Sequence, residues 1–171
     1  VVAAKLYGDS TLYWTFFLVN ENLQDLNDWP KSNALFKRFI DRKYSGTCLT
    51  AANSTDIVSY NHTTNISSKF TLGEKVSQSD SIYGFVTDVN PTHNRITLNS
   101  ISGIFTANGT VTGEESEKSF TISSVQNEED AVHHYKDSND LRTTVSTNNT
   151  VVTNLRYERD INEDKHTIRY I

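Results

Sequence analysis

Residues 85–98 read Phe85-Val-Thr-Asp-Val-Asn-Pro-Thr-His-Asn-Arg-Ile-Thr-Leu98, and this stretch decides the fold at the centre of the chain. Two short β-branched runs flank a connection that contains Asn90, Pro91 and Asn94. Proline has no N–H group to donate to a strand ladder, and asparagine tolerates positive φ. The stretch therefore predicts a β-hairpin.

The hairpin lies in a β-rich region, residues 47–126, that is dominated by Ser, Thr, Asn and Gly. The pattern Phe-Thr, with Val at the sixth position after the Phe, occurs at Phe70 and again at Phe105. We expect a small β-barrel or sandwich in which each of these rings enters the core just before a glycine-containing turn. The short β-branched runs predict strands at Asp56–Tyr60, Tyr83–Val89, Arg95–Leu98, Gly103–Thr106 and Ser119–Ser123.

Residues 1–46 have the helical periodicity of the chain and predict a compact helical head. Gly8 is expected to end a first helix, and Asp9 and Ser10 to cap a second helix from Thr11 to about Asn20. After the Trp29-Pro30 turn, Ser32 is expected to cap a third helix. Its apolar positions are Leu35, Phe36, Phe39, Ile40 and Tyr44.

Residues 127–171 predict a carboxy-terminal element made of a hairpin, a helix and a strand. The hairpin strands are Ala131–Tyr135 and Leu141–Val145, and Thr153 or Asn154 would cap a helix over 155–165. Thr167–Ile171 is expected to be a final strand that needs a partner edge. The fold class is therefore α+β, with a helical head, a β-rich insert and this closing element.

The composition excludes several classes of protein. The chain has 171 residues and a formal net charge of -5, which argues against a nucleic-acid partner. No apolar run is long enough to span a membrane, and no signal-peptide pattern opens the sequence. Cys48 is the single cysteine, so no internal disulfide can form. The lack of any methionine indicates that the chain is the remainder of a longer product.

The chain shows no pattern of a catalytic, metal or cofactor site. His133 and His134 are adjacent on a predicted strand, where neighbouring side chains point to opposite faces, so they should not chelate one ion. The carboxylates of Glu114, Glu115 and 128–130 lie in polar segments and read as solvated loop charge. Cys48 reads as a small buried hydrophobe, and no phosphate-binding loop is present. We expect no enzyme activity.

An aromatic cluster near the start of the chain is its densest signal, formed by Tyr7, Tyr13, Trp14, Phe16, Phe17 and Trp29. These rings can form the core of the head, an interface with another protein, or a surface on which a sugar stacks. A head of this size cannot enclose all six. Truncating Trp14 to alanine should therefore cost about 3 to 5 kcal/mol or abolish a protein contact.

Two segments resemble a known family. Ala4-Lys-Leu-Tyr-Gly-Asp-Ser-Thr-Leu-Tyr-Trp14, Leu18-Val-Asn20 and Asn27-Asp-Trp-Pro30 resemble the LysM-like segment of the baseplate wedge protein of T4-like contractile-tailed phages. The stretch from Leu155 to Arg169 is similar to the closing segment of that family. The first strand of a complete LysM module would lie before Val1.

The resemblance implies a structural protein of the virion, located in the tail baseplate and assembled in the bacterial cytoplasm. It would join neighbouring wedges in a ring around the tail tube, with other wedge proteins as partners and no cofactor. The alternative is a LysM-type module that binds peptidoglycan or chitin, and a cell-wall hydrolase acting through Glu114 or Glu128 is a third. The interface residues are expected to be Tyr7, Tyr13, Trp14, Phe17, Trp29, Tyr157, Ile168, Arg169, Tyr170 and Ile171.

Overall fold

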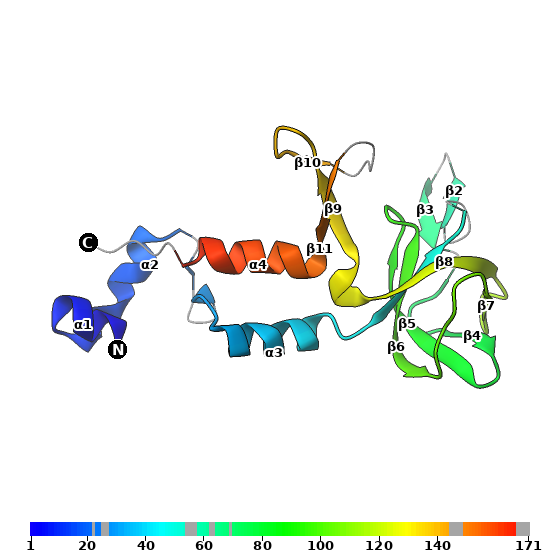
Figure 1. The fold of residues 1–171 in the computed structure, drawn as a ribbon, viewed down its shortest axis with the longest axis horizontal. Coiled ribbons are helices and arrows are strands. Elements are labelled where there is room, and N and C mark those ends of the chain that lie inside the picture. The colour runs from blue at the N-terminus through cyan, green and yellow to red at the C-terminus, as the bar shows by residue number, and fades with distance from the viewer. Residues whose placement is uncertain are drawn as a thin grey trace. The chain divides into compact units, whose positions relative to one another are not determined.

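A computed structural model describes residues 1–21, 23–24, 28–53, 58–61, 64–68, 70–143 and 149–166 (Figure 1). The chain forms two compact units. The terminal unit combines Val1–Phe39 with Leu155–Ile171, and the central unit is Ile40–Asn154. None of the described helices has both the length and the apolar character that a membrane crossing requires.

The terminal unit begins with three short helical segments, α1 (Val2–Tyr7), η1 (Ser10–Trp14) and α2 (Thr15–Val19). As predicted, α1 ends at Gly8, whose φ of 72° is the left-handed conformation that glycine adopts most easily. The side chain of Asp9 accepts a hydrogen bond from the Thr11 N–H at 2.8 Å and caps the next segment, which is also as predicted.

The predicted helix from Thr11 to Asn20 is divided into a 3-10 segment and an α-helix. The hydroxyl of Thr15 donates to the carbonyl of Leu12, three residues earlier, at the junction. The side-chain amide of Asn20 donates to the carbonyl of Phe16, where α2 ends. Side chains that bond to the backbone in this way compete with regular helix bonding, so the segment does not continue as one helix.

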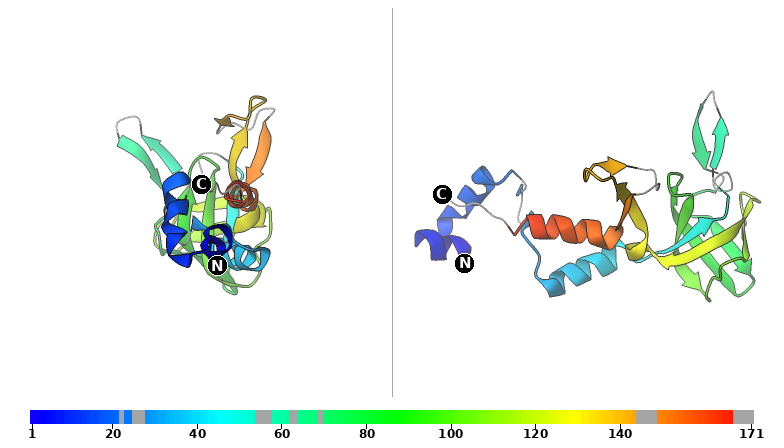
Figure 2. Two further views of the ribbon diagram at one scale, coloured as in Figure 1. Left: turned by 90° about the vertical axis from the view of Figure 1, so that its left-hand side faces the viewer. Right: turned by 45° about the horizontal axis from the view of Figure 1, so that its top comes forward.

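Two longer helices complete the helical part of the chain. They are α3 (Asn33–Lys43), which matches the predicted third helix, and α4 (Asn154–Asp164), which matches the predicted carboxy-terminal helix. Both are amphipathic, and they lie side by side (Figures 1 and 2). Leu35 was expected on the buried face of α3 but is exposed, so the covered face is narrower than the sequence pattern indicates.

The central unit contains a closed antiparallel barrel of six strands in the order β1-β6-β5-β4-β7-β8. The predicted hairpin is present: β5 and β6 pair with Val89 opposite Ile96, and Asn94 in the turn has a φ of 50°. The barrel strands are β1 (Thr47–Ala51), β4 (Lys75–Ser79), β5 (Ile82–Asn90), β6 (Arg95–Ser102), β7 (Thr110–Gly113) and β8 (Ser119–Asn127).

The barrel core is filled by alternating side chains of these strands together with Phe70 and Phe105. Both rings are buried, and Phe70 meets Phe120 edge-to-face with centroids 5.5 Å apart. Gly73 and Gly109 follow the two rings in the turns, as the repeated pattern predicted. The other buried core residues are Leu49, Ala51, Val76, Val86, Ile96, Leu98, Val111 and Ile122.

The strand predictions for the central unit are wrong at one place and incomplete at others. Gly103–Thr106 is not a strand, because Gly103 adopts a φ of 74° and turns the chain so that Ile104 is exposed while Phe105 enters the core. The strands β1, β4 and β7 were not predicted, since Ser, Thr and Lys hide their alternation. Asp56–Tyr60 overlaps β2 (Val58–Asn61), which pairs with β3 (Thr64–Ser68), but residues 54–57 lie outside the described residues.

A three-stranded sheet follows the barrel in the order β10-β9-β11. The predicted hairpin is present as β9 (Val132–Lys136) and β10 (Arg142–Thr143), with the Asp137 carboxylate accepting from the N–H groups of Asn139 and Leu141 in the turn. The strand β11 (Thr150–Thr153) was not predicted. The predicted final strand, Thr167–Ile171, lies outside the described residues.

Glu74 is a buried carboxylate that ties two turns of the barrel together. One oxygen accepts from the N–H of Thr71 at 2.8 Å, and the other accepts from the N–H and hydroxyl of Ser116 at 2.9 and 2.6 Å. Burial opposes ionisation, but these hydrogen bonds outweigh it and hold the pKa of Glu74 below its ordinary value. The ionised form therefore stabilises the fold above the unfolded-state pKa, and this contribution is lost as the pH falls through the folded-state pKa.

We expect Glu74→Gln to lower the free energy of unfolding by about 1 to 3 kcal/mol at neutral pH, because an amide group would face the donors that the carboxylate now satisfies. Urea denaturation followed by circular dichroism measures this change, and the difference from the parent should shrink in acid. Glu114→Gln is the matched control, since Glu114 is exposed and forms a surface ion pair with Lys75 at 3.2 Å. Equal losses in the two variants would contradict the proposed role of Glu74.

Candidate functional site

The aromatic cluster of the terminal unit is a continuous series of ring contacts around Phe16, whose side chain is 1% exposed. Phe16 contacts Tyr7 and Trp29 at centroid distances of 5.8 and 5.4 Å. Phe17 contacts Trp29 and Tyr13 at 6.3 and 6.4 Å, with the rings edge-to-face. Five of the six predicted rings therefore pack on one another, which is the geometry that aromatic pairs favour.

Trp14 has a different position from the one expected of a core residue. Its side chain is 50% exposed, and that of its neighbour Tyr13 is 54% exposed. The expectation that Trp14→Ala removes a core side chain is therefore wrong, because the buried ring is that of Phe16 in α2, whereas Trp14 at the end of η1 is half exposed. Trp14 and Tyr13 remain available for contact with another molecule.

The terminal unit buries few of its apolar side chains. Its fully buried apolar residues among those described are Ala3, Phe16 and Leu23. A larger group, which we call the exposed apolar set, comprises Val1, Val2, Leu6, Tyr13, Trp14, Leu18 and Leu35. Small units bury a low fraction of their surface, and exposed apolar side chains in this number are typical of surfaces that contact another protein.

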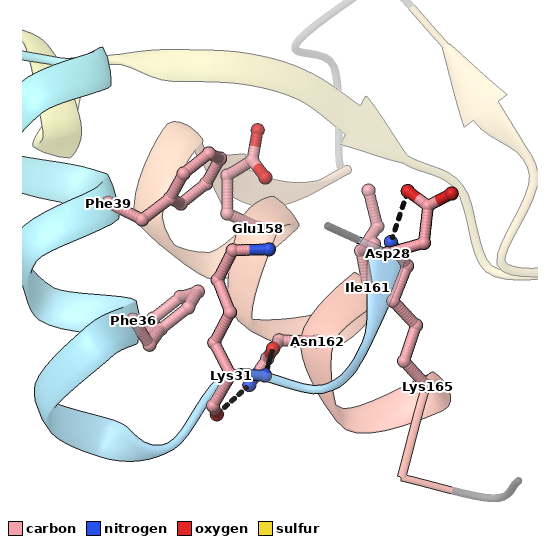
Figure 3. Close-up of a pocket in the computed structure, with 8 residues that line it drawn as sticks. All are labelled: Asp28, Lys31, Phe36, Phe39, Glu158, Ile161, Asn162 and Lys165. Carbon is pink, nitrogen blue, oxygen red and sulfur yellow. Dashed lines mark hydrogen bonds and ion pairs between the residues drawn. The ribbon is translucent and has the colours of Figure 1, made fainter. Parts of the chain in front are cut away.

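A groove of about 410 Å³ lies between α3 and α4 (Figure 3). Phe36 and Phe39 extend from α3 toward α4, where Ile161 provides a third apolar side chain. The rest of the lining is polar or charged, and its residues are Asp28, Lys31, Glu158, Asn162 and Lys165.

Hydrogen bonds between Lys31 and Asn162 hold the two sides of the groove together. The backbone N–H of Lys31 donates to Oδ1 of Asn162 at 2.8 Å, and Nδ2 of Asn162 donates to the carbonyl of Lys31 at 3.1 Å. Lys165 adds an ion pair with Asp28 at 3.5 Å, and the ammonium of Lys31 lies 5.0 Å from the centre of the Phe39 ring. The groove is thus fixed by polar contacts and keeps apolar surface on α3 and α4.

The histidine geometry differs from the sequence expectation. Nδ1 of His133 lies 2.8 Å from Nδ1 of His134, although adjacent residues of a regular strand point to opposite faces. The register between β9 and β11 shifts between Val152 and Thr153, and such a bulge redirects a side chain. No group of three or more potential metal ligands forms within the described ranges.

Cys48 and Glu114 have the environments predicted for them, whereas Glu128 does not. The Cys48 thiol is fully buried, which raises its pKa, and its sulfur lies 3.4 Å from the hydroxyl of Thr97. Glu114 is exposed beside Lys75. Glu128 is half-buried and accepts a hydrogen bond from the N–H of Gly46 at 2.9 Å. Its carboxylate therefore bonds to the backbone before β1 and is not a solvated loop charge as predicted.

The remaining predicted interface residues are at the carboxy-terminal end. Tyr157 is half-buried on α4. Ile168, Arg169, Tyr170 and Ile171 lie outside the described residues.

The amino-terminal segment of the chain is similar to a known protein family. Residues 1–61 match the family model described as base plate wedge protein 53. This segment is therefore similar to baseplate wedge proteins. Neither the curated proteins nor the solved structures compared with the chain include a match.

The match confirms the resemblance to a baseplate wedge protein. It supports a structural role in the tail baseplate of a phage virion and association with other baseplate components. The matched wedge segment contains the aromatic cluster, the exposed apolar set and the α3 side of the groove. The similarity of 155–169 to the family and the LysM-like character of the head lie beyond what the match covers and stay predictions.

The groove between α3 and α4 was not predicted from the sequence. Phe36 and Phe39 were predicted only as apolar positions of the third helix, and Asn162 was recognised only as part of the segment that resembles the closing segment of the family. An asparagine at an amphipathic helix position gives no indication of a backbone partner 131 residues away.

We expect Phe16→Ala to destabilise the terminal unit by about 3 to 5 kcal/mol, because it removes a fully buried ring. Trp14→Ala should cost less than about 1 kcal/mol, since half of that side chain is already in water. Trp14 and Trp29 are the only tryptophans of the chain, so tryptophan fluorescence during urea unfolding reports on this unit alone. Comparable destabilisation by both variants would contradict the observed packing.

Asn162→Ala should release α4 from the segment before α3, because it removes both hydrogen bonds to Lys31, at a cost of about 1 to 3 kcal/mol. Hydrogen–deuterium exchange of the α4 amides measures this release. Glu163→Ala is the control, since the side chain of Glu163 is exposed on the same helix turn. Unchanged exchange in Asn162→Ala would show that other contacts hold α4.

Proposed function

We propose that this protein is a structural component of a phage tail baseplate wedge, and that it joins neighbouring wedges around the tail tube through its terminal unit. The observation that carries the proposal is the exposed apolar set, which lies within the residues that match the wedge family. A wedge protein works by contact with its neighbours, and these side chains are the apolar surface that such contact would cover.

Interface energetics favour the same residues. Burying one large apolar side chain is worth about 1.5 to 3 kcal/mol, so a few of the exposed apolar set suffice for a stable contact. Tryptophan and tyrosine carry much of the binding energy in many interfaces, and Tyr13 and Trp14 are both half exposed. Tyr7, Phe17 and Trp29 would support them from within the cluster rather than touch the partner first.

A ring of wedges also explains why each contact can be modest. Copies arranged in a closed ring repeat the same contact, and linked contacts reinforce one another through effective concentration. The groove between α3 and α4 offers a second apolar surface with a charged rim, suited to an amphipathic segment of a neighbouring protein.

The second candidate is a LysM-type module that binds peptidoglycan or chitin. It is favoured by one observation, the two adjacent exposed rings of Tyr13 and Trp14, because aromatic faces can stack on sugars. Titration calorimetry of the full chain with peptidoglycan fragments separates the two candidates. Saturable heat of binding that is lost in Trp14→Ala supports the LysM-type sugar-binding module.

We expect Leu18→Asp to weaken incorporation of the protein into wedges by at least tenfold without unfolding it. Leu18 is 71% exposed, so a charge is tolerated in the free chain but not in an apolar contact. Reconstitution with the other baseplate proteins of the same phage, followed by sedimentation, measures incorporation. Leu72→Asp is the matched control, because Leu72 is 66% exposed in the central unit. Normal incorporation of Leu18→Asp would contradict the proposal.

A further inference from the structure

A cleft of about 380 Å³ opens on the central unit beside the turn that joins β5 to β6. Its walls come from β1, β6, β8 and β9, and among the described residues that line it none is acidic. The lining side chains that matter for its chemistry are Thr50, His93, Arg95, Ser124, Gln126 and Tyr135.

Arg95 is a buried cation in this wall that lacks a counter-charge within the described part of the chain. Its side chain is 6% exposed, and Nη1 donates to the carbonyl of Val132 at 2.7 Å. Nε is buried and has no hydrogen-bond partner in the structure. A buried charge is costly unless it is paired, so the cleft contains a strong donor that still needs an acceptor.

His93 is a second titratable residue of the cleft, close to Arg95 in the sequence. The His93 ring packs against Tyr135 with centroids 5.9 Å apart, and its Nε2 lies 3.4 Å from the carbonyl of His133. Burial lowers the pKa of His93, and the charges of Arg95 and Arg142 lower it further. Both effects disfavour the charged form of His93, whereas Arg95 carries a permanent charge in the cleft.

We propose that this cleft binds a carboxylate group through Arg95. The contact with Val132 occupies Nη1 and leaves the edge formed by Nε and Nη2, whose two parallel N–H groups match the two oxygens of a carboxylate. Thr50, Ser124 and Gln126 line the same cleft and have hydroxyl or amide groups that can also donate. The carboxylate belongs either to an acidic side chain of a partner protein or to a small free molecule.

The first experiment is an NMR titration of the full chain with sodium acetate at constant ionic strength, using sodium chloride as the compensating salt. The Arg95 Nε–H and His93 ring signals should shift with saturation at concentrations on the order of millimolar, as expected for so small a ligand. Chloride alone should not shift them. Identical behaviour in the two salts would overturn the proposal, because water would then satisfy Arg95.

Gln126→Glu tests the site without removing Arg95, since it places a carboxylate inside the cleft. We expect it to weaken acetate binding at least tenfold while the chain stays folded. Gln24→Glu adds the same charge at an exposed position in the terminal unit and should leave acetate binding unchanged. Equal acetate affinity in both variants would also overturn the proposal.

Wedge reconstitution identifies the source of the carboxylate. If Gln126→Glu blocks acetate and also lowers incorporation at least tenfold relative to Gln24→Glu, an acidic side chain of a partner protein occupies the cleft. If it blocks acetate but not incorporation, the ligand is a small free carboxylate. Both results support the site, and the acetate titration does not depend on the proposed role in the baseplate.

Discussion

The reciprocal hydrogen bonds between Lys31 and Asn162 join parts of the chain that are 131 residues apart. Because of this contact, the beginning of the chain and α4 form one unit, and the residues between them form a long insertion. Closing so long a loop is entropically costly when it is flexible. Here the insertion contains its own closed barrel, so much of that entropy is lost in folding the barrel and not in joining the ends.

The two units satisfy their apolar residues in different ways. The barrel closes on itself, so its strands leave no open edge and its core covers Phe70, Phe105 and the alternating strand residues. The terminal unit has no comparable core and leaves Tyr13, Trp14 and Leu18 in water. This asymmetry agrees with the proposal that the segment matching the wedge family is the part that associates with other proteins, while the insertion has a core of its own.

Two buried charged side chains of the central unit also differ in whether their hydrogen-bonding groups have partners. Glu74 is buried and fully engaged by the donors of Thr71 and Ser116, so its charge belongs to the fold. Arg95 is buried and lines a cleft, and its Nε has no hydrogen-bond partner although its Nη1 donates to Val132. The carboxylate of Glu74 therefore has hydrogen-bond donors for both of its oxygens, whereas the guanidinium of Arg95 keeps a buried N–H without an acceptor. This difference is why the proposed ligand site is at Arg95.

Local chemistry in the sequence determined the end of α1 at Gly8, the cap at Asp9, the hairpin around Asn94 and the entry of both repeated phenylalanines into the core. Each depends on the conformational preference of one or a few neighbouring residues. The wedge resemblance is likewise carried by contiguous residues. Only the tertiary structure decided that Phe16 is covered while Trp14 is not, that a bulge brings His133 to His134, and that Asn162 binds Lys31. These features depend on which distant segments of the chain come into contact, and residue type and spacing along the chain do not specify those contacts.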